Sequence, residues 1–223
     1  MAIEVVAFDV HQTLAHWPAG RVQPIEVQRL LSRFGIEISY WAFDAVRQTI
    51  LLLDGPKREI QGWTDFLALL FARLQVPVSV DLLAALTAMH ESRDGMELYP
   101  DVMPCLTAVK AAGLRSCTFT TLPAFMMGDV RHQVLPLIDH YLNCSAVGAA
   151  KGDRRFYQRI TEKLGVPPDH ILCVGDDPLS DVELTVEAGW KAVLLDRRGK
   201  HGDVHANQLG TIDSLSELRC YYP

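Results

Sequence analysis

The sequence lacks an apolar run long enough to cross a bilayer and lacks an excess of positive charge. No window approaches the roughly 18 apolar residues that a spanning helix needs. Lys and Arg number 21 against 27 Asp and Glu, which gives a net charge of −6. The basic pairs Arg154-Arg155 and Arg197-Arg198 are short, and we expect both to be solvated. These features argue against a membrane protein and against a nucleic-acid partner.

Cysteine pairs with metal-binding or redox spacing are also missing. The 5 cysteines make an odd number without a CxxC motif, and Cys117, Cys144 and Cys173 lie in strand-like stretches. We therefore expect buried free thiols in a reducing compartment rather than a disulfide framework. The amino-terminal stretch carries the acids Glu4 and Asp9 and no basic segment of the kind that opens a secretory signal. This composition predicts a cytoplasmic protein.

The apolar run at residues 3–8 ends abruptly in polar residues, Asp9, His11 and Thr13. Val and Ile favour extended backbone, and a continuous apolar run is typical of a strand that is buried on both faces. Ligands of open α/β sheets bind at the carboxyl edge of such strands, so Asp9 is a candidate site residue. Taken alone, the pattern is equally consistent with an aspartate that caps a turn.

Residues 18–96 show only the apolar spacing of helices, with no strand-like run. Helices are predicted near 24–34, 39–53, 64–74 and 79–94, and their candidate N-caps are Ser39, Thr64, and Ser79 or Asp81. The 223 residues suffice for one large domain and one small one. We therefore predict a small all-helical domain at 18–96, inserted into a main domain formed by 1–17 and 97–223.

Strands and helices alternate from residue 97 onwards. Strands are predicted at 115–120, 141–146, 171–174 and 191–195, with a last one near 211–212; helices are predicted at 101–112, 123–134, 153–164 and 178–188, with a turn of helix from Ser214. Alternation at these lengths predicts an α/β fold with a doubly wound, parallel, Rossmann-like sheet and right-handed crossovers.

Polar residues follow the later strands, at the edge where Asp9 follows the first. These residues are Thr120 and Thr121, Lys151 in a Gly-rich loop, and Asp176, Asp177 and Asp181. Each has an ordinary explanation as a helix cap or a surface residue. Because parallel strands share one carboxyl edge, however, the set would surround a single cleft with carboxylates, hydroxyls and one ammonium group.

The order FDVHQTL, FTT, AKGDRRFYQ and VGDDPLSDVELTVEAGW resembles the haloacid dehalogenase superfamily of aspartate-nucleophile hydrolases, over nearly the whole chain. In that family the helical insert is a cap domain, which corresponds to 18–96. The roles that the resemblance implies are catalysis for Asp9, His11 and Lys151, phosphate binding for Thr120, Thr121 and Lys151, Mg²⁺ binding for Asp9, the His11 backbone carbonyl and Asp176, and support for Thr13, Asp177 and Asp181. Asp181 would orient Lys151, and Asp177 is the alternative to Asp176 as metal ligand.

Phosphoryl transfer is chemically compatible with these residue types. A carboxylate that attacks phosphorus approaches an anion, so Mg²⁺ and Lys151 would offset the repulsion. Mg²⁺ is bound by few carboxylates and keeps several waters. The Thr120 hydroxyl and the Thr121 N–H can donate to equatorial phosphoryl oxygens.

One position departs from the family pattern. Phosphatase members carry a second Asp two residues after the nucleophile as general acid/base, and His11 occupies this position here. An imidazole, with a pKa near ~6.5, exchanges protons at neutral pH, although a neighbouring Mg²⁺ would disfavour its protonated form. Thr121 stands where Asn is frequent, and Gly152 replaces a Pro. Members that cleave carbon–halogen bonds have an aromatic residue at the position of His11 and need no metal.

These patterns predict a Mg²⁺-dependent hydrolase of small phosphorylated metabolites that acts through an aspartyl-phosphate, with turnover weakened if His11 replaces the carboxylate poorly. One alternative is a hydrolase of the 2-haloacid dehalogenase type. The other is a catalytically idle binding or scaffold protein that keeps the same fold.

Overall fold

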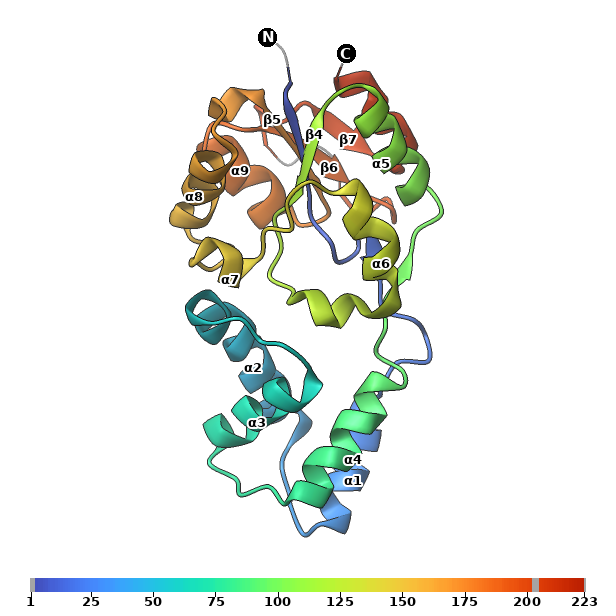
Figure 1. The fold of residues 1–223 in the computed structure, drawn as a ribbon, viewed down its shortest axis with the longest axis vertical. Helices are drawn as coiled ribbons and strands as arrows, with labels where there is room; N and C mark the ends of the chain where they lie inside the picture. Colours follow the sequence, from blue (N-terminus) through green and yellow to red (C-terminus); the bar gives the residue numbers. More distant parts are fainter. Residues whose placement is uncertain (1–2, 202–204, 223) are drawn as a thin grey trace.

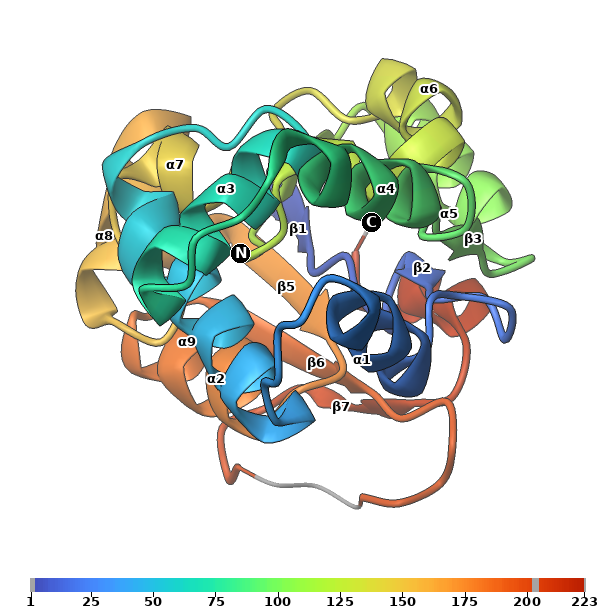
Figure 2. The ribbon, with the colours of Figure 1, turned by 90° about the horizontal axis from the view of Figure 1, so that it is seen from below.

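The computed structural model describes residues 3–201 and 205–222. Two parts are visible in Figure 1, a parallel sheet flanked by helices and a group of four helices beyond one end of that sheet. The first and last described stretches of the chain lie at the opposite end of the sheet. Viewed from below, the four helices lie in front of the sheet's carboxyl edge (Figure 2). No helix within the described ranges is both long enough and apolar enough to span a membrane.

The main sheet has five parallel strands in the order β4-β1-β5-β6-β7. The strands are β1 (Val5–Phe8), β4 (Arg115–Thr118), β5 (Ile171–Gly175), β6 (Lys191–Leu195) and β7 (Gly210–Ile212). Strand β1 lies between β4 and β5, and Phe8 pairs with Thr118 on one side and Val174 on the other. The residues that follow these three strands therefore meet at one edge.

Helices cover both faces of this sheet, as predicted for a doubly wound fold. Val6 and Phe8 of β1 pack into one core, and Val5 and Ala7 pack into a second core on the opposite face. The first core is closed by α5 (Val102–Ala111) and the 3₁₀ helix η7 (Leu215–Tyr221), and the second by α8 (Arg154–Leu164), η6 (Pro178–Glu183) and α9 (Leu184–Glu187). A short 3₁₀ helix, η5 (Pro168–His170), precedes β5.

The inserted segment is helical, as its apolar spacing predicts. It contains α1 (Pro24–Arg33), α2 (Tyr40–Thr49), η1 (Ile50–Asp54), η2 (Gly55–Lys57), α3 (Trp63–Leu74) and α4 (Val80–Glu91). Ser39 and Ser79 cap α2 and α4 through their hydroxyls, which accept from the backbone at 3.2 Å. The predicted cap Thr64 is wrong, because α3 begins one residue earlier and the Thr64 hydroxyl instead pairs with that of Thr87.

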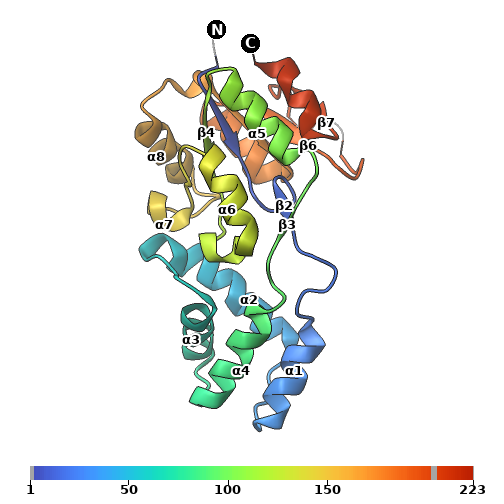
Figure 3. The same cartoon turned by 45° about the vertical axis from the view of Figure 1, so that its right-hand side comes forward.

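A two-stranded ribbon joins the helical segment to the sheet. Strand β2 (Ala15–His16) pairs antiparallel with β3 (Glu97–Leu98), so the two connections lie side by side (Figure 3). Two-residue strands carry no periodic signal, and the sequence did not predict them. The ribbon fixes the points at which the chain leaves and re-enters the sheet domain.

The single α-helix predicted at 123–134 is wrong. The chain instead forms the 3₁₀ helix η3 (Ala124–Val130), the short α6 (Arg131–Val134) and η4 (Leu135–Leu137). Gly128 has a φ of 61°, which breaks the helix, and a Cβ at this position would collide with Gly95 in the second connection. The break therefore brings the loop after β4 against the helical segment.

The strand predicted at 141–146 is also wrong. Asn143 caps the short helix α7 (Cys144–Val147) by accepting from the Ala146 N–H at 2.9 Å, and only isolated bridges at His140 and Asn143 touch the region of β4. Cys144 is therefore helical. All five cysteines are free, four of them buried and Cys220 exposed, which confirms the expectation of free thiols.

Candidate active site

Three candidate residues follow three adjacent strands. Asp9 comes directly after β1, Thr120 lies two residues after β4, and Asp176 follows β5. Because Phe8, Thr118 and Val174 are in register, the residues after them reach the same edge of the sheet. The structure thus brings together the polar groups that the sequence placed there.

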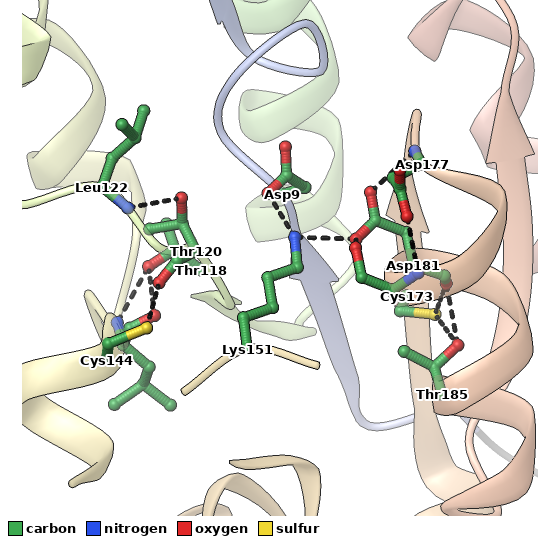
Figure 4. Close-up of polar contacts among 12 residues, drawn as sticks. Asp9, Thr118, Thr120, Leu122, Cys144, Lys151, Cys173, Asp177, Asp181 and Thr185 are labelled. Atoms are coloured by element: carbon green, nitrogen blue, oxygen red, sulfur yellow. Dashed lines mark hydrogen bonds and ion pairs between the residues drawn. The ribbon is translucent and has the colours of Figure 1, made fainter. Parts of the chain in front are cut away.

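Lys151 lies between two carboxylates (Figure 4). Its Nζ is 2.5 Å from Oδ1 of Asp9 and 2.7 Å from Oδ1 of Asp181. The side chains of Lys151, Asp9 and Asp181 are only 7%, 8% and 1% exposed, respectively. Burial favours the neutral amine, but the carboxylates of Asp181 and Asp9 outweigh it and raise the pKa of Lys151. The site therefore contains a buried, permanently charged ammonium group beside Asp9.

Asp181 is fixed by its own helix. Its Oδ2 accepts from the backbone N–H of Asp177, and its Oδ1 accepts from the Ser180 hydroxyl, both at 3.0 Å. A Cβ on Gly175 would collide with the Asp181 carboxylate, so the close approach requires glycine at this position. With its oxygens held in this way, Asp181 can orient Lys151.

Asp176 and Asp177 have different surroundings. Oδ1 of Asp177 accepts from the Ser180 N–H at 2.6 Å and caps the following helix. Burial, followed by the neighbouring charges of Asp9 and Asp181, raises the pKa of Asp176 to about 7. Asp176 thus belongs to the group of carboxylates that faces Asp9.

The residues present fit a divalent cation. One oxygen from each of Asp9, Asp176 and Asp181 lies within 4.8 Å of the other two. Both oxygens of Asp181 accept hydrogen bonds, from Lys151 and Ser180 and from the Asp177 N–H, whereas Lys151 contacts only one oxygen of Asp9, so Asp9 and Asp176 could hold Mg²⁺. Close carboxylates repel one another, and a bound cation would relieve the repulsion that raises the pKa of Asp176.

The three threonines occupy distinct places. The Thr120 hydroxyl oxygen accepts from the Leu122 N–H at 3.2 Å, so its proton is available to a ligand. Thr121 lines a cavity between the sheet and the helical segment. Thr13 is fully buried, and its hydroxyl has no partner among residues 3–201 and 205–222. The backbone carbonyl of Thr13 accepts from Arg197 at 3.0 Å.

His11 is half-buried and faces the same cavity as Thr121. Burial, then the charges of Arg21 and Arg47, lower the pKa of His11 to about 4. The next residue, Gln12, has a φ of 64° and accepts from the Tyr99 hydroxyl at 2.8 Å, which holds the loop in a left-handed conformation that non-glycine residues rarely adopt. A neutral imidazole suits proton acceptance better than proton donation.

Arg197 ties the loop after β1 to Asp101, a link that the sequence did not predict, and the expectation that Arg197 is solvated is wrong. The side chain is 15% exposed, binds both Asp101 oxygens at 2.8 and 2.9 Å, and lies 3.9 Å from the centre of the Tyr99 ring. Asp101 is 96 residues away in sequence, so only the fold reveals the pair. By contrast, Arg154 and Arg155 are exposed as expected.

These features define a doubly wound α/β protein in which a buried Asp–Lys–Asp arrangement and a carboxylate cluster that fits a cation lie at the carboxyl edge of a parallel sheet. Residues 3–189 match the family model of haloacid dehalogenase-like hydrolases, and the chain belongs to this family. The family predicted from the four motifs is thus confirmed.

The chain is similar in sequence to phosphatases, and in fold to solved structures of phosphatases and dehalogenases. The chain is 30% identical to a phosphatase of Mycobacterium tuberculosis over 192 residues, which covers 78% of this chain and 85% of the relative. The crystal structure of a 2-haloacid dehalogenase from Pseudomonas syringae matches with a TM-score of 0.71 at 21% identity, covering 97% of this chain and 96% of that one. An HAD phosphatase from Thermococcus onnurineus matches with a TM-score of 0.68 at 20% identity, with coverages of 98% and 97%. At these identities the two structures establish the fold alone.

Proposed function

We propose that the protein is a Mg²⁺-dependent phosphatase of small phosphorylated molecules. Residues 1–17 and 97–223 would form the catalytic core, and residues 18–96 would act as its cap. The observation that carries the proposal is the position of Lys151 between Asp9 and Asp181, with Asp176 beside them. The similarity to a mycobacterial phosphatase supports the same reaction class.

Asp9 would act as the nucleophile. One oxygen is bonded to Lys151, and the other would attack phosphorus, forming an Asp–O–P bond as the ester P–O bond breaks. The leaving oxygen takes up a proton, and water then attacks the same phosphorus to release phosphate and regenerate Asp9. Mg²⁺, when held by Asp9, the His11 carbonyl and Asp176, would supply charge neutralisation at the phosphoryl group.

The remaining residues would bind the phosphoryl group or move protons. The Lys151 ammonium and the free proton of the Thr120 hydroxyl would bind phosphoryl oxygens, together with the Thr121 N–H. Asp181 would position Lys151, and the neutral His11 imidazole would accept a proton from the attacking water. Donation to the leaving group would be the weak step, because an imidazole with a lowered pKa is seldom protonated.

A second candidate function is carbon–halogen hydrolysis. The observation that favours it is His11, an aromatic ring at the position where the resemblance implies a second aspartate in phosphatases. In that reaction Asp9 would displace halide from carbon, and no cation would be required.

Phosphate release from a panel of phosphate esters tests the proposal, with Mg²⁺ and with a chelator, beside chloride release from chloroacids. Asp9→Asn purified in parallel controls for contaminating enzymes. Phosphate release that needs both Mg²⁺ and Asp9 supports the phosphatase. Chloride release in chelator supports the second candidate, and neither activity would leave a binding protein and contradict both.

A further inference from the structure

The loop after β1 contains a residue with an unusual backbone conformation next to a candidate metal ligand. Gln12 has a φ of 64°, in the left-handed region where non-glycine residues are uncommon. This torsion adjoins the peptide bond between His11 and Gln12. If that peptide unit rotates to give Gln12 a negative φ, the His11 carbonyl turns with it. The contacts that hold Gln12 therefore also hold the backbone carbonyl of His11.

Hydrogen bonds show how the peptide between His11 and Gln12 is oriented. The Gln12 N–H donates to the Ala15 carbonyl at 2.7 Å. The C=O and N–H of a trans peptide point in opposite directions, so the His11 carbonyl faces away from Ala15. The N–H groups of Leu14 and Ala15 both donate to the carbonyl of Val10, at 2.9 Å each. The carbonyl of Val10, and not that of His11, is thus the one that closes the loop.

Two consecutive arginines after β6 contact this loop from outside. Arg197 donates to the Thr13 carbonyl at 3.0 Å, and Arg198 donates to Oε1 of Gln12 at 3.3 Å. The turn that carries both arginines is itself fixed, because the buried carboxylate of Asp196 accepts from the Arg198 N–H at 3.3 Å. The basic pair seen in the sequence therefore contacts two successive residues of the loop after β1.

Tyr99 joins the same loop to the second connection of the helical segment. It follows β3, its N–H donates to the Leu14 carbonyl at 3.2 Å, and its hydroxyl donates to Oε1 of Gln12 at 2.8 Å. The Arg197 guanidinium lies 3.9 Å from the centre of the Tyr99 ring and binds Asp101, just before α5, at 2.8 and 2.9 Å. Arg197 thus joins the loop after β1, the second connection and the start of α5.

A left-handed non-glycine residue persists only where its surroundings over-determine the conformation. We propose that Arg197, Arg198 and Tyr99 form a clamp that holds the peptide between His11 and Gln12 and so keeps the His11 carbonyl available to Mg²⁺. The cation's use of this carbonyl rests on the proposed phosphatase function. The three side chains are positioning residues, because they act through the loop and not on the reacting atoms.

Arg197→Met tests the clamp by calorimetry with Mg²⁺. The variant keeps an apolar side chain beside Tyr99 and removes the bond to Thr13. We expect the Kd for Mg²⁺ to rise about tenfold, because a site that is correctly shaped only part of the time binds in proportion to that fraction. Turnover at saturating Mg²⁺ should change less than about twofold. Arg154→Met is the control, since it removes an exposed arginine and its ion pair with Glu187, and its Kd should be unchanged.

Gln12→Gly and Gln12→Ala form a matched pair that isolates the backbone conformation. Both lack the side chain that Tyr99 and Arg198 hold, but only glycine adopts a positive φ without steric cost. The Kd for Mg²⁺ should be about five- to tenfold higher for the alanine variant. Combined with Arg197→Met, Gln12→Gly should lower the Kd again by about fivefold. If Arg197 only stabilised the fold, glycine at position 12 would not restore Mg²⁺ affinity.

Hydrogen exchange followed by mass spectrometry tests the clamp without metal. Exchange in peptides that cover the Leu14 and Ala15 amides should be faster in Arg197→Met than in the unmodified protein, and unchanged in Arg154→Met. Tyr99→Phe is the milder variant if Arg197→Met fails to fold. It removes only the hydroxyl, and we expect the Kd for Mg²⁺ to rise about threefold.

The outcomes separate the clamp from the proposed function. Phosphatase activity that needs Mg²⁺ and Asp9, with the same Kd in all these variants, would overturn the clamp and leave the phosphatase standing. If the unmodified protein binds no Mg²⁺, the proposed function is overturned and hydrogen exchange decides the rest. Faster exchange in Arg197→Met then supports the clamp as the device that holds the loop, and equal exchange overturns it.

Discussion

The sheet-edge site and the cavity beside it contain different kinds of side chains. At the edge, the Lys151 ammonium and the Asp9 and Asp181 carboxylates are buried and bonded to one another. In the cavity, aromatic and aliphatic side chains such as Phe43 and Trp63 lie beside the charged side chains of Arg21, Asp44 and Arg47. The first region is held together by its own ion pairs, whereas the second encloses a space of about 390 Å³.

The two regions also differ in how the backbone positions them. Asp9 and Asp176 directly follow strands whose register is set by backbone pairing, so the charged groups have little freedom. The cavity walls come from helices joined to the sheet through the β2–β3 ribbon. In the proposed enzyme the sheet edge would perform the reaction, and the helical segment would choose the molecule that undergoes it.

Asp9→Asn should remove catalysis at the sheet edge and leave the cavity unchanged. The amide has nearly the same shape but is a poor nucleophile, so kcat should fall by about 10⁴-fold or more. Phosphate release under saturating substrate measures the loss. Circular dichroism should show that the fold is unchanged. Activity of more than a few per cent in a rigorously purified sample would rule out Asp9 as nucleophile.

Lys151→Met should damage both catalysis and folding. Two buried carboxylates would face each other without their ammonium partner, which costs about 3–5 kcal/mol of unfolding free energy. We expect kcat/KM to fall about 10²- to 10³-fold from weaker phosphoryl binding. Urea unfolding and steady-state kinetics measure the two effects. Lys163→Met on the exposed end of α8 is the control, and equal behaviour of the two variants would contradict a central role for Lys151.

His11→Asp tests the residue that lies at the junction of the two regions. Protonation leaves a carboxyl group neutral but turns an imidazole into a cation beside the charges of Arg21 and Arg47 and any bound Mg²⁺, so the carboxyl can donate to the leaving group at lower electrostatic cost, and we expect kcat to rise about 10²-fold. The gain should be largest for substrates with poor leaving groups. Mg²⁺ titration should show almost unchanged metal binding in His11→Ala, because only the backbone carbonyl is a candidate ligand. A native enzyme of ordinary speed that His11→Asp slows would show instead that the site is built around the histidine.

Gly175→Ala should displace the Asp181 carboxylate, which positions Lys151 in the sheet-edge site. The added methyl collides with the Asp181 carboxylate, which should cost about 1–3 kcal/mol of stability and lower kcat about tenfold as Lys151 shifts. Thermal unfolding and kinetics measure both. Gly20→Ala is the matched control, since a Cβ there meets nothing within 4 Å. If the two alanine variants behave alike, the packing of Asp181 on Gly175 is unimportant.

The sequence predicted the sheet edge better than the cavity, for a physical reason. Buried parallel strands are continuous apolar runs, so the ends of β1 and β5, and with them Asp9 and Asp176, can be located by inspection. The left-handed Gly128 and the cap Asn143 misled the prediction, because tertiary packing decides there between helix and strand.

Pairs distant in sequence could not be predicted. Val22 and Asp94 are 72 residues apart, and Arg197 and Asp101 are 96 apart, with no local pattern to indicate either contact. The stacking of His90 on Trp63 is likewise visible only after the helices pack. Local sequence patterns predict most of the elements and the motif residues, whereas long-range packing determines the cavity.

The most direct test of the central claim is to trap the covalent intermediate on Asp9. A single turnover is quenched in acid and reduced with borohydride before trypsin isolates residues 1–21, which contain both Asp9 and His11. A second portion is quenched in alkali, because acid destroys a phosphohistidine. Borohydride reduction distinguishes them, because it converts an aspartyl phosphate to homoserine and leaves a phosphorylated histidine unreduced. We predict reduction at Asp9 in the unmodified protein and none in Asp9→Asn. Turnover of a phosphate ester with phosphate on His11, or with no modified peptide at any time point, would contradict the account.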